Sequence, residues 1–232
     1  MLSFTAYISE FSEENEDISN LHEVSVVNEK NYFNKVSDMK DQPWGPVPKS
    51  VSTKSRDDKI EYINKVYDEY LPKLKKLEKT LASKLKSSAS KIGNAKVITN
   101  IKAKDDLAMK VVDRNKKLEG ITDFLRSTIV VPTSEDLDKV TDGVFRKFDK
   151  VYEYNPKERG AGGYGYYGAR HLLVDLDGFI VEVQLKPRKL ATYQKAAHKL
   201  YKATRAKQDT MDPAELKKAQ AKSRRIFDRG NK

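Results

Sequence analysis

A predicted β-hairpin is the feature that most constrains how this chain folds. Asp177-Gly178 lies between two apolar runs within residues 165–186. A two-residue hairpin turn requires positive φ at both central positions, which Asp and Gly adopt readily. Strand pairing then follows by counting outward from the turn. The predicted pairs are Leu176 with Phe179, Leu173 with Glu182, and His171 with Gln184.

The hairpin is expected to have one polar and one apolar face, because side chains alternate along a strand. The polar face carries Glu182, Gln184, Lys186 and His171. The apolar face carries Leu172, Val174, Leu176, Phe179, Val181, Val183 and Leu185. A half-solvated strand would explain this without any function. However, residues 160–168 contain five glycines and three tyrosines, which favour a flexible, aromatic approach to a binding face.

These residues resemble the RelA/SpoT-type nucleotidyltransferases. That family combines a Gly-Tyr-x-Ser/Gly-x-His segment, a hairpin and a Glu-x-Gln-Ile/Leu-Arg strand. Residues 165–171 read Gly-Tyr-Tyr-Gly-Ala-Arg-His, and residues 182–186 read Glu-Val-Gln-Leu-Lys. The resemblance implies transfer of the β,γ-pyrophosphate of ATP to a 3′-hydroxyl. The acceptor is GDP or GTP in the alarmone synthetases and the tRNA end in related toxins.

The resemblance also implies roles for single residues. Tyr166 is similar to the tyrosine that stacks on the acceptor base. Glu182 resembles the carboxylate that helps to hold Mg²⁺ and activates the 3′-hydroxyl, and Gln184 resembles a positioning group beside it. His171 comes one residue later than a gapless match, which places Arg170 there instead. The hairpin count favours His171, because Arg170 would point to the other face.

A second carboxylate is expected upstream, because phosphoryl transfer requires a divalent metal held by more than one acidic group. Asp123 precedes the β-branched run of residues 128–131, at the mouth of a predicted strand. It resembles the metal-binding Asp of the family, in which Arg usually follows five residues later. Here Arg126 follows after three residues, and Thr128 occupies the usual place. Considered alone, Asp123 could equally be a helix cap or a turn residue.

Two lysines are candidates for binding the ATP phosphates. Lys102 and Lys104 resemble the Arg-x-Lys strand end that grips ATP in the family, with Lys102 replacing the arginine. Lysine neutralises phosphate but cannot stack flat on adenine as a guanidinium does. Without the resemblance, such a lysine pair is typical of a solvated surface.

Composition limits the function classes. A chain of 232 residues with 38% apolar content can bury one core of ordinary domain size, with extensions. The absence of cysteine excludes disulfides, thiolate catalysis and Cys-based zinc sites. The three histidines are too scattered for a His-Asp metal cluster, so we expect synthesis without the hydrolase half of bifunctional relatives. We expect no membrane span and no secretory signal, and a cytoplasmic location in a bacterium or host cell.

Charge is unevenly distributed along the chain. Residues 1–29 hold seven Asp/Glu and no Lys/Arg, whereas residues 186–232 hold fifteen Lys/Arg and four Asp/Glu. A basic surface beside a transferase site would attract nucleotides or the phosphate backbone of tRNA. Solvated helix faces are the alternative explanation.

Residues 1–55 are predicted to be an acidic, proline-containing extension, and residues 56–232 the nucleotidyltransferase-like domain. Residues 42–48 contain three prolines and a glycine, which forbid regular structure. Trp44 either docks on the domain or marks a linker. Residues 1–10 resemble the amino-terminal tags of internal head proteins of tailed phages, with Ile8-Ser-Glu10 as the cleavage point. That resemblance implies packaging into a virion; a frayed helix is the alternative.

The expected fold is a mixed α/β (α+β) domain with a five-stranded sheet flanked by helices. An apolar stripe from Ile60 to Leu81 predicts a long helix that packs on the sheet or forms a coiled-coil dimer. Pro72 predicts a kink or two abutting helices. Further strands are expected near 95–102, 127–132 and 149–155, and further helices near 104–117, 134–147, 188–206 and 213–227.

The predicted function is a Mg²⁺-dependent pyrophosphotransferase that uses ATP and a guanine nucleotide. Lys102, Lys104 and Arg126 would neutralise the donor phosphates, while Asp123 and Glu182 would hold the metal. Pyrophosphorylation of the tRNA end is one alternative. A catalytically silent binding module is the other, because Lys102, Thr128 and Lys186 stand where the family has arginine, and lysine cannot clamp phosphate in a bidentate manner.

Overall fold

The computed structural model describes residues 41–154, 168–205 and 210–231. Within these ranges, five strands form one sheet in the order β1-β2-β5-β4-β3. The strands are β1 Lys96–Ile101, β2 Leu125–Val131, β3 Val151–Tyr154, β4 Arg170–Leu176 and β5 Phe179–Pro187. Strands β2 and β5 are parallel, and the other neighbouring pairs are antiparallel. The predicted mixed five-stranded sheet is therefore confirmed.

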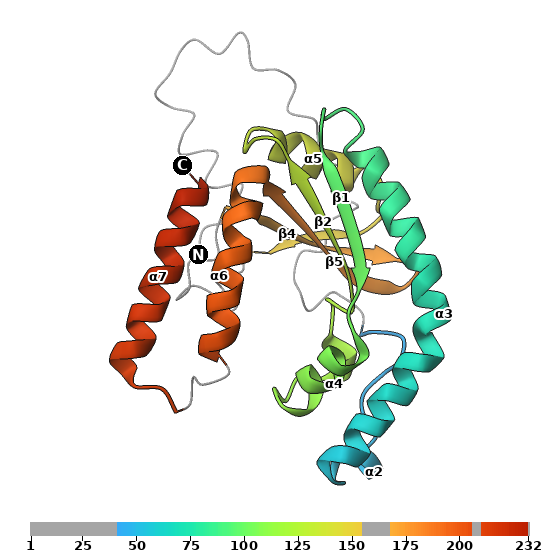
Figure 1. The fold of residues 1–232 in the computed structure, drawn as a ribbon. Coiled ribbons are helices and arrows are strands. Elements are labelled where there is room, and N and C mark those ends of the chain that lie inside the picture. Colours follow the sequence, from blue (N-terminus) through green and yellow to red (C-terminus); the bar gives the residue numbers. More distant parts are fainter. Residues whose placement is uncertain (1–40, 155–167, 206–209, 232) are drawn as a thin grey trace, which may run out of the picture.

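Helices cover both faces of this sheet (Figure 1). In the described ranges they are α2 Lys49–Ser52, α3 Arg56–Ser88, α4 Lys104–Val112, α5 Asp136–Phe145, α6 Arg188–Arg205 and α7 Pro213–Asn231, with a short 3₁₀ turn at Leu118–Gly120. The main core lies between the sheet and α3, α4 and α5. A smaller cluster of Leu190, Ala197 and Phe227 joins α6 to α7. No helix in the described ranges is long and apolar enough to cross a membrane.

The hairpin forms with the predicted turn and register. Asp177 and Gly178 have φ values of 52° and 82°. The strand partners are those obtained by counting from the turn. The apolar face is buried in the main core, as predicted. The polar face is not half-solvated, however, because Glu182, Gln184, Lys186 and His171 are only 7–9% exposed.

The predicted long helix is α3, and its apolar stripe packs on the sheet of its own chain, not in a coiled coil. Ser55 begins the helix with a capping box, in which its hydroxyl accepts a hydrogen bond from the Asp58 N–H. The helix continues through Pro72, so the expectation of two abutting helices is wrong. Pro72 removes one backbone hydrogen bond. Buried leucines after it, including Leu74 and Leu77, hold the helix on the core.

Helix α4 ends at Val112, five residues earlier than predicted. Asn115 shortly afterwards has a φ of 47°, a left-handed conformation that a continuing helix cannot contain. The chain then turns through residues 113–124 into β2. This turn brings Asp123 to the end of the sheet.

Trp44 docks on the domain, which resolves the two alternatives left open by the sequence. Its Nε1 donates a hydrogen bond to the Leu118 carbonyl at 3.0 Å. Its ring makes edge contacts with the rings of Tyr70, Phe124 and Phe179. The described residues before α2 therefore pack on the domain.

Candidate active site

The predicted polar residues meet on one face of the sheet, which we call the site face. It carries Arg126 and Thr128 from β2, His171 from β4, and Glu182, Gln184 and Lys186 from β5. Pairing in the sheet sets Arg126 beside Glu182, and Thr128 beside Gln184. Helix α6 begins directly after β5 and lies against this face (Figure 1).

Glu182 is held by the neighbouring strand. Its Oε1 lies 3.3 Å from Nδ1 of His171, and both side chains are 9% exposed. The contact exists because His171 in β4 and Glu182 in β5 point to the same face of adjacent strands. A buried carboxylate oriented by an imidazole is suited to accepting a proton from a hydroxyl.

Lys186 and Gln184 form a polar cluster with α6. The ammonium of Lys186 donates hydrogen bonds to Oε1 of Gln184 at 2.8 Å and to Oε1 of Gln194 at 2.7 Å. The pKa of Lys186 is lowered to about 8, chiefly by burial and also by the positive charge of Arg126, while the negative charge of Glu182 opposes both effects. Lys186 therefore orients both amide groups while it is charged.

Asp123 lies two residues before β2 and is held by two lysines. Lys110 Nζ is 2.6 Å from Oδ1 of Asp123, and Lys102 Nζ is 3.2 Å from Oδ2. The Lys102 N–H donates to the Phe124 carbonyl, which ties the end of β1 to the segment that carries Asp123. Burial raises the pKa of Asp123, but the charges of Lys110 and Lys102 outweigh it and hold the pKa below its usual range.

The two predicted carboxylates influence each other. The negative charge of Glu182 raises the pKa of Asp123, in opposition to the lysines. Arg126 links the segment that carries Asp123 to the strand that carries Glu182, because it follows Asp123 by three residues and pairs with Glu182 across the sheet. Asp123 and Glu182 thus belong to one charged cluster at the β2–β5 pair.

One predicted residue, Lys104, is not brought into this cluster, and another lies outside the described residues. Lys104 turns to α3, where its Nζ lies 2.6 Å from Oδ2 of Asp68 and 5.9 Å from the ring centre of Tyr67. Tyr166 lies outside the described residues, as do residues 1–40 with the predicted cleavage point. Arg170 points away from the site face, as predicted, and pairs with Asp138 of α5.

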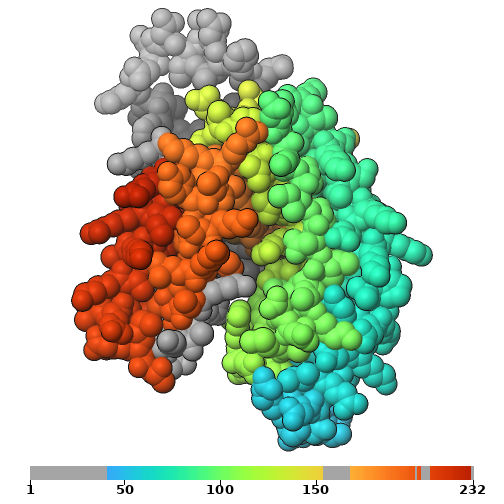
Figure 2. Space-filling view, viewed as in Figure 1, coloured from blue at the N-terminus to red at the C-terminus, as the bar shows by residue number. Residues whose placement is uncertain are grey.

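A pocket of about 280 Å³ opens between the site face and α6. Figure 2 shows the surface hollowed between α6 and the segment of β1 and α4. The lining residues are Arg126, Thr128, His171, Gln184 and Lys186 from the sheet, and Ala191, Gln194, Lys195 and His198 from α6. The pocket is rich in cationic side chains and hydrogen-bond donors, which suit an anionic polar ligand.

Sequence reasoning missed Lys110, Gln194 and Lys195. Lys110 follows Lys102 by eight residues with a chain turn between them, and nothing local predicts that both meet Asp123. Gln194 and Lys195 are ordinary polar residues of a basic helix until α6 is placed over β5. A single sequence contains no signal for these contacts.

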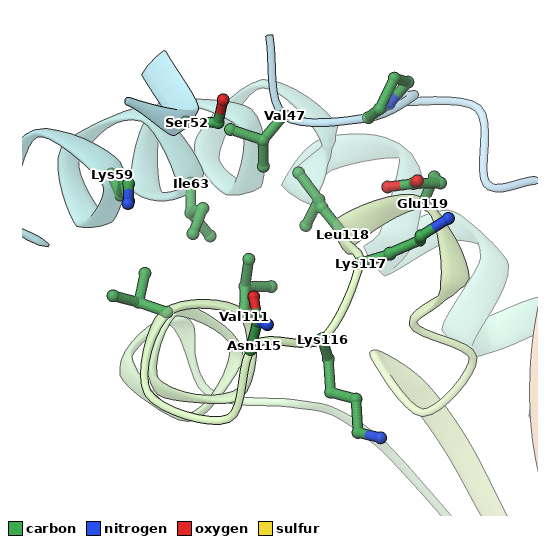
Figure 3. Close-up of a pocket in the computed structure, with 12 residues that line it drawn as sticks. Val47, Ser52, Lys59, Ile63, Val111, Asn115, Lys116, Lys117, Leu118 and Glu119 are labelled. Carbon is green, nitrogen blue, oxygen red and sulfur yellow. The ribbon is translucent and has the colours of Figure 1, made fainter. Parts of the chain in front are cut away.

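A second pocket, of about 270 Å³, has a different lining (Figure 3). Val47, Ile63, Val111 and Leu118 line it together with three lysines, among other residues. The predicted site residues do not line this pocket.

Asp123 and Glu182 are the candidate metal ligands. No group of three or more His, Asp or Glu residues in the described part of the chain could hold a metal ion on its own. Mg²⁺ is commonly bound by one or two carboxylates together with substrate phosphates and water. The donor set therefore fits a metal that arrives with a phosphate ligand, and does not fit an all-protein metal cage.

No protein-family model matches this sequence, and no curated protein matches it. Solved structures do match. Small alarmone synthetase 1 from Bacillus subtilis aligns with a TM-score of 0.52 and 16% identity, over 70% of this chain and 92% of that chain. The same enzyme bound to its product pppGpp aligns with a TM-score of 0.53 and 14% identity, over 70% and 91%.

A further match is the Type VI effector Tas1, solved in complex with its immunity protein. It aligns with a TM-score of 0.52 and 18% identity, over 72% of this chain and 96% of that chain. These likenesses confirm the predicted nucleotidyltransferase-like fold. The chain has the fold of the small alarmone synthetases.

Proposed function

We propose that this protein is a Mg²⁺-dependent pyrophosphotransferase that moves pyrophosphate from ATP to the 3′-hydroxyl of GDP or GTP. The observation that carries the proposal is the charged cluster in which Asp123 and Glu182 act on each other beside the parallel β2–β5 pair. Support also comes from the shared fold, since the enzyme from Bacillus subtilis has pppGpp as its product.

The donor nucleotide would lie on the Asp123 side. Lys102 and Lys110 converge there, and both could turn from Asp123 to the ATP phosphates. Bound Mg²⁺ would neutralise phosphate charge and polarise the transferred group. Lys104 remains a predicted phosphate ligand, but its ion pair with Asp68 favours Lys110 for that role.

The acceptor would lie on the Glu182 side. Glu182 would accept the proton of the 3′-hydroxyl, oriented by His171 at 3.3 Å. The 3′-oxygen forms a bond to the β-phosphorus of ATP, the bond from that phosphorus to the α,β-bridging oxygen breaks, and AMP leaves. Gln184 and Lys186 line the adjoining pocket and would hold the acceptor phosphates, while Tyr166 is proposed to stack on the base. Arg126, assigned from the sequence to the donor phosphates, lines the same pocket, and we assign it to the acceptor phosphates instead.

The test incubates the protein with γ-labelled ATP and Mg²⁺ in three separate reactions, which contain GDP, GTP or bulk tRNA as the acceptor. The proposal predicts label on a guanine nucleotide and its loss in Glu182→Gln and Asp123→Asn. Saturable nucleotide binding without transfer to any acceptor would instead establish a silent binding module.

The tRNA 3′ end is the second candidate acceptor, because a basic helix forms one wall of the pocket. Lys195 and His198 of α6 line the pocket, and α6 packs against α7, which is also basic. Lys217 and Lys218 on α7 are exposed and do not line the pocket. If tRNA is the acceptor, the charge reversal Lys217→Glu/Lys218→Glu abolishes transfer to tRNA. If GDP is the acceptor, the same variant keeps its activity.

A further inference from the structure

Gln42 is a buried polar residue that joins two distant segments. It is 3% exposed. Its Nε2 donates hydrogen bonds to the carbonyl of Ile121 at 3.1 Å and to the carbonyl of Ile180 at 2.7 Å. Its Oε1 accepts a bond from the Ile180 N–H at 3.4 Å. All polar atoms of this one amide thus bind backbone groups.

The two segments are those that carry the candidate carboxylates. Ile121 comes two residues before Asp123, and Ile180 comes two residues before Glu182. Parallel pairing of β2 with β5 begins only at Arg126 and Glu182. At Ile180, strand β5 therefore extends past β2, and the Gln42 amide takes the hydrogen bonds that a neighbouring strand would otherwise make.

Gln42 is itself anchored from several sides. Its backbone N–H donates to the Glu119 carbonyl at 2.9 Å. Tyr70 Oη donates to the carbonyl of Pro43 at 3.2 Å, and Trp44 is bonded to Leu118. Farther along the same segment, Val47 reaches the pocket that Leu118 also lines (Figure 3). The segment 41–48 is thus fixed to the domain at Gln42 and at the residues that follow it.

We infer that Gln42 is a positioning residue that sets the separation of Asp123 and Glu182. Segment 41–48 is then part of the catalytic unit and no mere extension. The inference rests on the proposed function, because it assigns a purpose to the spacing of those two carboxylates. Misplacing a reacting group by about 1 Å can slow an enzyme about 100-fold. A bond network two residues from each carboxylate is placed to prevent that.

The test compares Gln42→Met with Tyr70→Phe. Gln42→Met keeps the side-chain length but loses the contacts to both segments. Gln42→Asn, a second variant, keeps an amide that is too short to reach both carbonyls. Tyr70→Phe is the matched control, because it frees the Pro43 carbonyl of the same segment while it keeps the ring of Tyr70 and the hydrogen bonds of Gln42 to Ile121 and Ile180. The measurements are label-transfer kinetics and hydrogen exchange of residues 118–125 and 179–184 in the full chain.

We expect both Gln42 variants to exchange faster in both peptides. We expect their kcat to fall about 10- to 100-fold with little change in KM for ATP, since positioning and not binding is lost. Tyr70→Phe should leave exchange and kcat near those of the wild type. Unchanged exchange in either peptide, or an equal effect of Tyr70→Phe, overturns the inference. If the wild type transfers no label, the proposed function fails, and the exchange data alone decide whether Gln42 holds the two segments.

Discussion

Lys110 and Asp123 form a 2.6 Å ion pair that joins helix α4 to the mouth of strand β2. Both side chains are largely buried, so the pair is screened from solvent less than a surface pair would be. Asp123 is consequently kept ionised, which a metal ligand must be. Under the proposed function, Lys110 also supplies a cation for the ATP phosphates.

Removal of the Lys110 ammonium is predicted to impair the site more than removal of the Lys104 ammonium. Lys110→Met should lower transfer about 10- to 100-fold, because it removes both the partner of Asp123 and a phosphate cation. Lys104→Met should lower it less, since Lys104 is paired with Asp68 on α3. The measurement is kcat/KM for ATP in both variants. A larger loss of kcat/KM in Lys104→Met than in Lys110→Met would contradict this prediction and would show that Lys104 binds the ATP phosphates, as the sequence predicted.

The ion pairs of Asp123 also predict an effect on acid stability. The pKa of Asp123 is lower in the folded state than in the unfolded state. The contribution of Asp123 to the free energy of unfolding is therefore present above the unfolded-state pKa, and it is lost as pH falls through the folded-state pKa. In Lys110→Met the pKa of Asp123 should rise, and this contribution should be lost at higher pH. Urea unfolding from about pH 6 down to about pH 2 measures it, because the loss in the wild type falls below the usual Asp pKa of about 3.9. Parallel pH dependence of the wild type and the variant would contradict the assignment.

Lys186 predicts an alkaline limit to anion binding. Its pKa of about 8 means that the pocket loses one positive charge as pH rises through that value. Nucleotide binding should weaken over this range in the wild type. It should not weaken there in Lys186→Arg, because a guanidinium stays protonated. Titration calorimetry at several pH values tests this. The folded-state pKa lies below the unfolded one, so folding stability should rise with pH from about 8 upward.

Arg126 should shift the pH at which nucleotide binding weakens. Its charge lowers the pKa of Lys186, so Arg126→Met is expected to move the weakening of nucleotide binding to higher pH. The same variant should bind nucleotide less tightly at every pH, since it removes a pocket cation. An unchanged midpoint in the binding titration would show that the two groups do not interact.

Gly143 is predicted to be essential for the contact of α5 with α3. A Cβ at this position would lie 2.4 Å from the Ser88 carbonyl oxygen, a backbone atom that cannot easily move. Gly143→Ala should therefore lower the free energy of unfolding by about 1–3 kcal/mol. Gly93→Ala is the matched control, because a Cβ there meets nothing within 4 Å. Urea denaturation compares them, and equal stability of the two variants would refute this packing.

The sequence predicted best those features that local rules determine. The Asp177-Gly178 turn fixed the register of the hairpin, and that register correctly placed His171 on the same face as Glu182 and Arg170 on the other face. Strand order, the parallel β2–β5 pair and the cover of α6 depend on tertiary packing. That packing buries the polar face of the hairpin, whereas the alternating sequence pattern alone is equally compatible with a half-solvated face.

Long-range contacts were beyond prediction from one sequence. Lys110 and Lys104 are chemically equivalent on one helix, and only the packing of α4 on α3 gives Lys104 to Asp68. Gln42 lies in a proline-containing segment with no periodic pattern, and its partners are 79 and 138 residues away. The continuity of α3 through Pro72 likewise reflects core packing on both sides of the proline.

Under the proposed function, Asp123 and Glu182 hold one metal ion together with the ATP phosphates. The most direct test measures Mn²⁺ affinity by electron paramagnetic resonance in the presence of a non-hydrolysable ATP analogue. It compares the wild type, Asp123→Asn, Glu182→Gln and the double variant. The account predicts that each single variant loses nearly as much affinity as the double variant, because both carboxylates bind the same ion. Losses that simply add, or an affinity that neither variant changes, would contradict it.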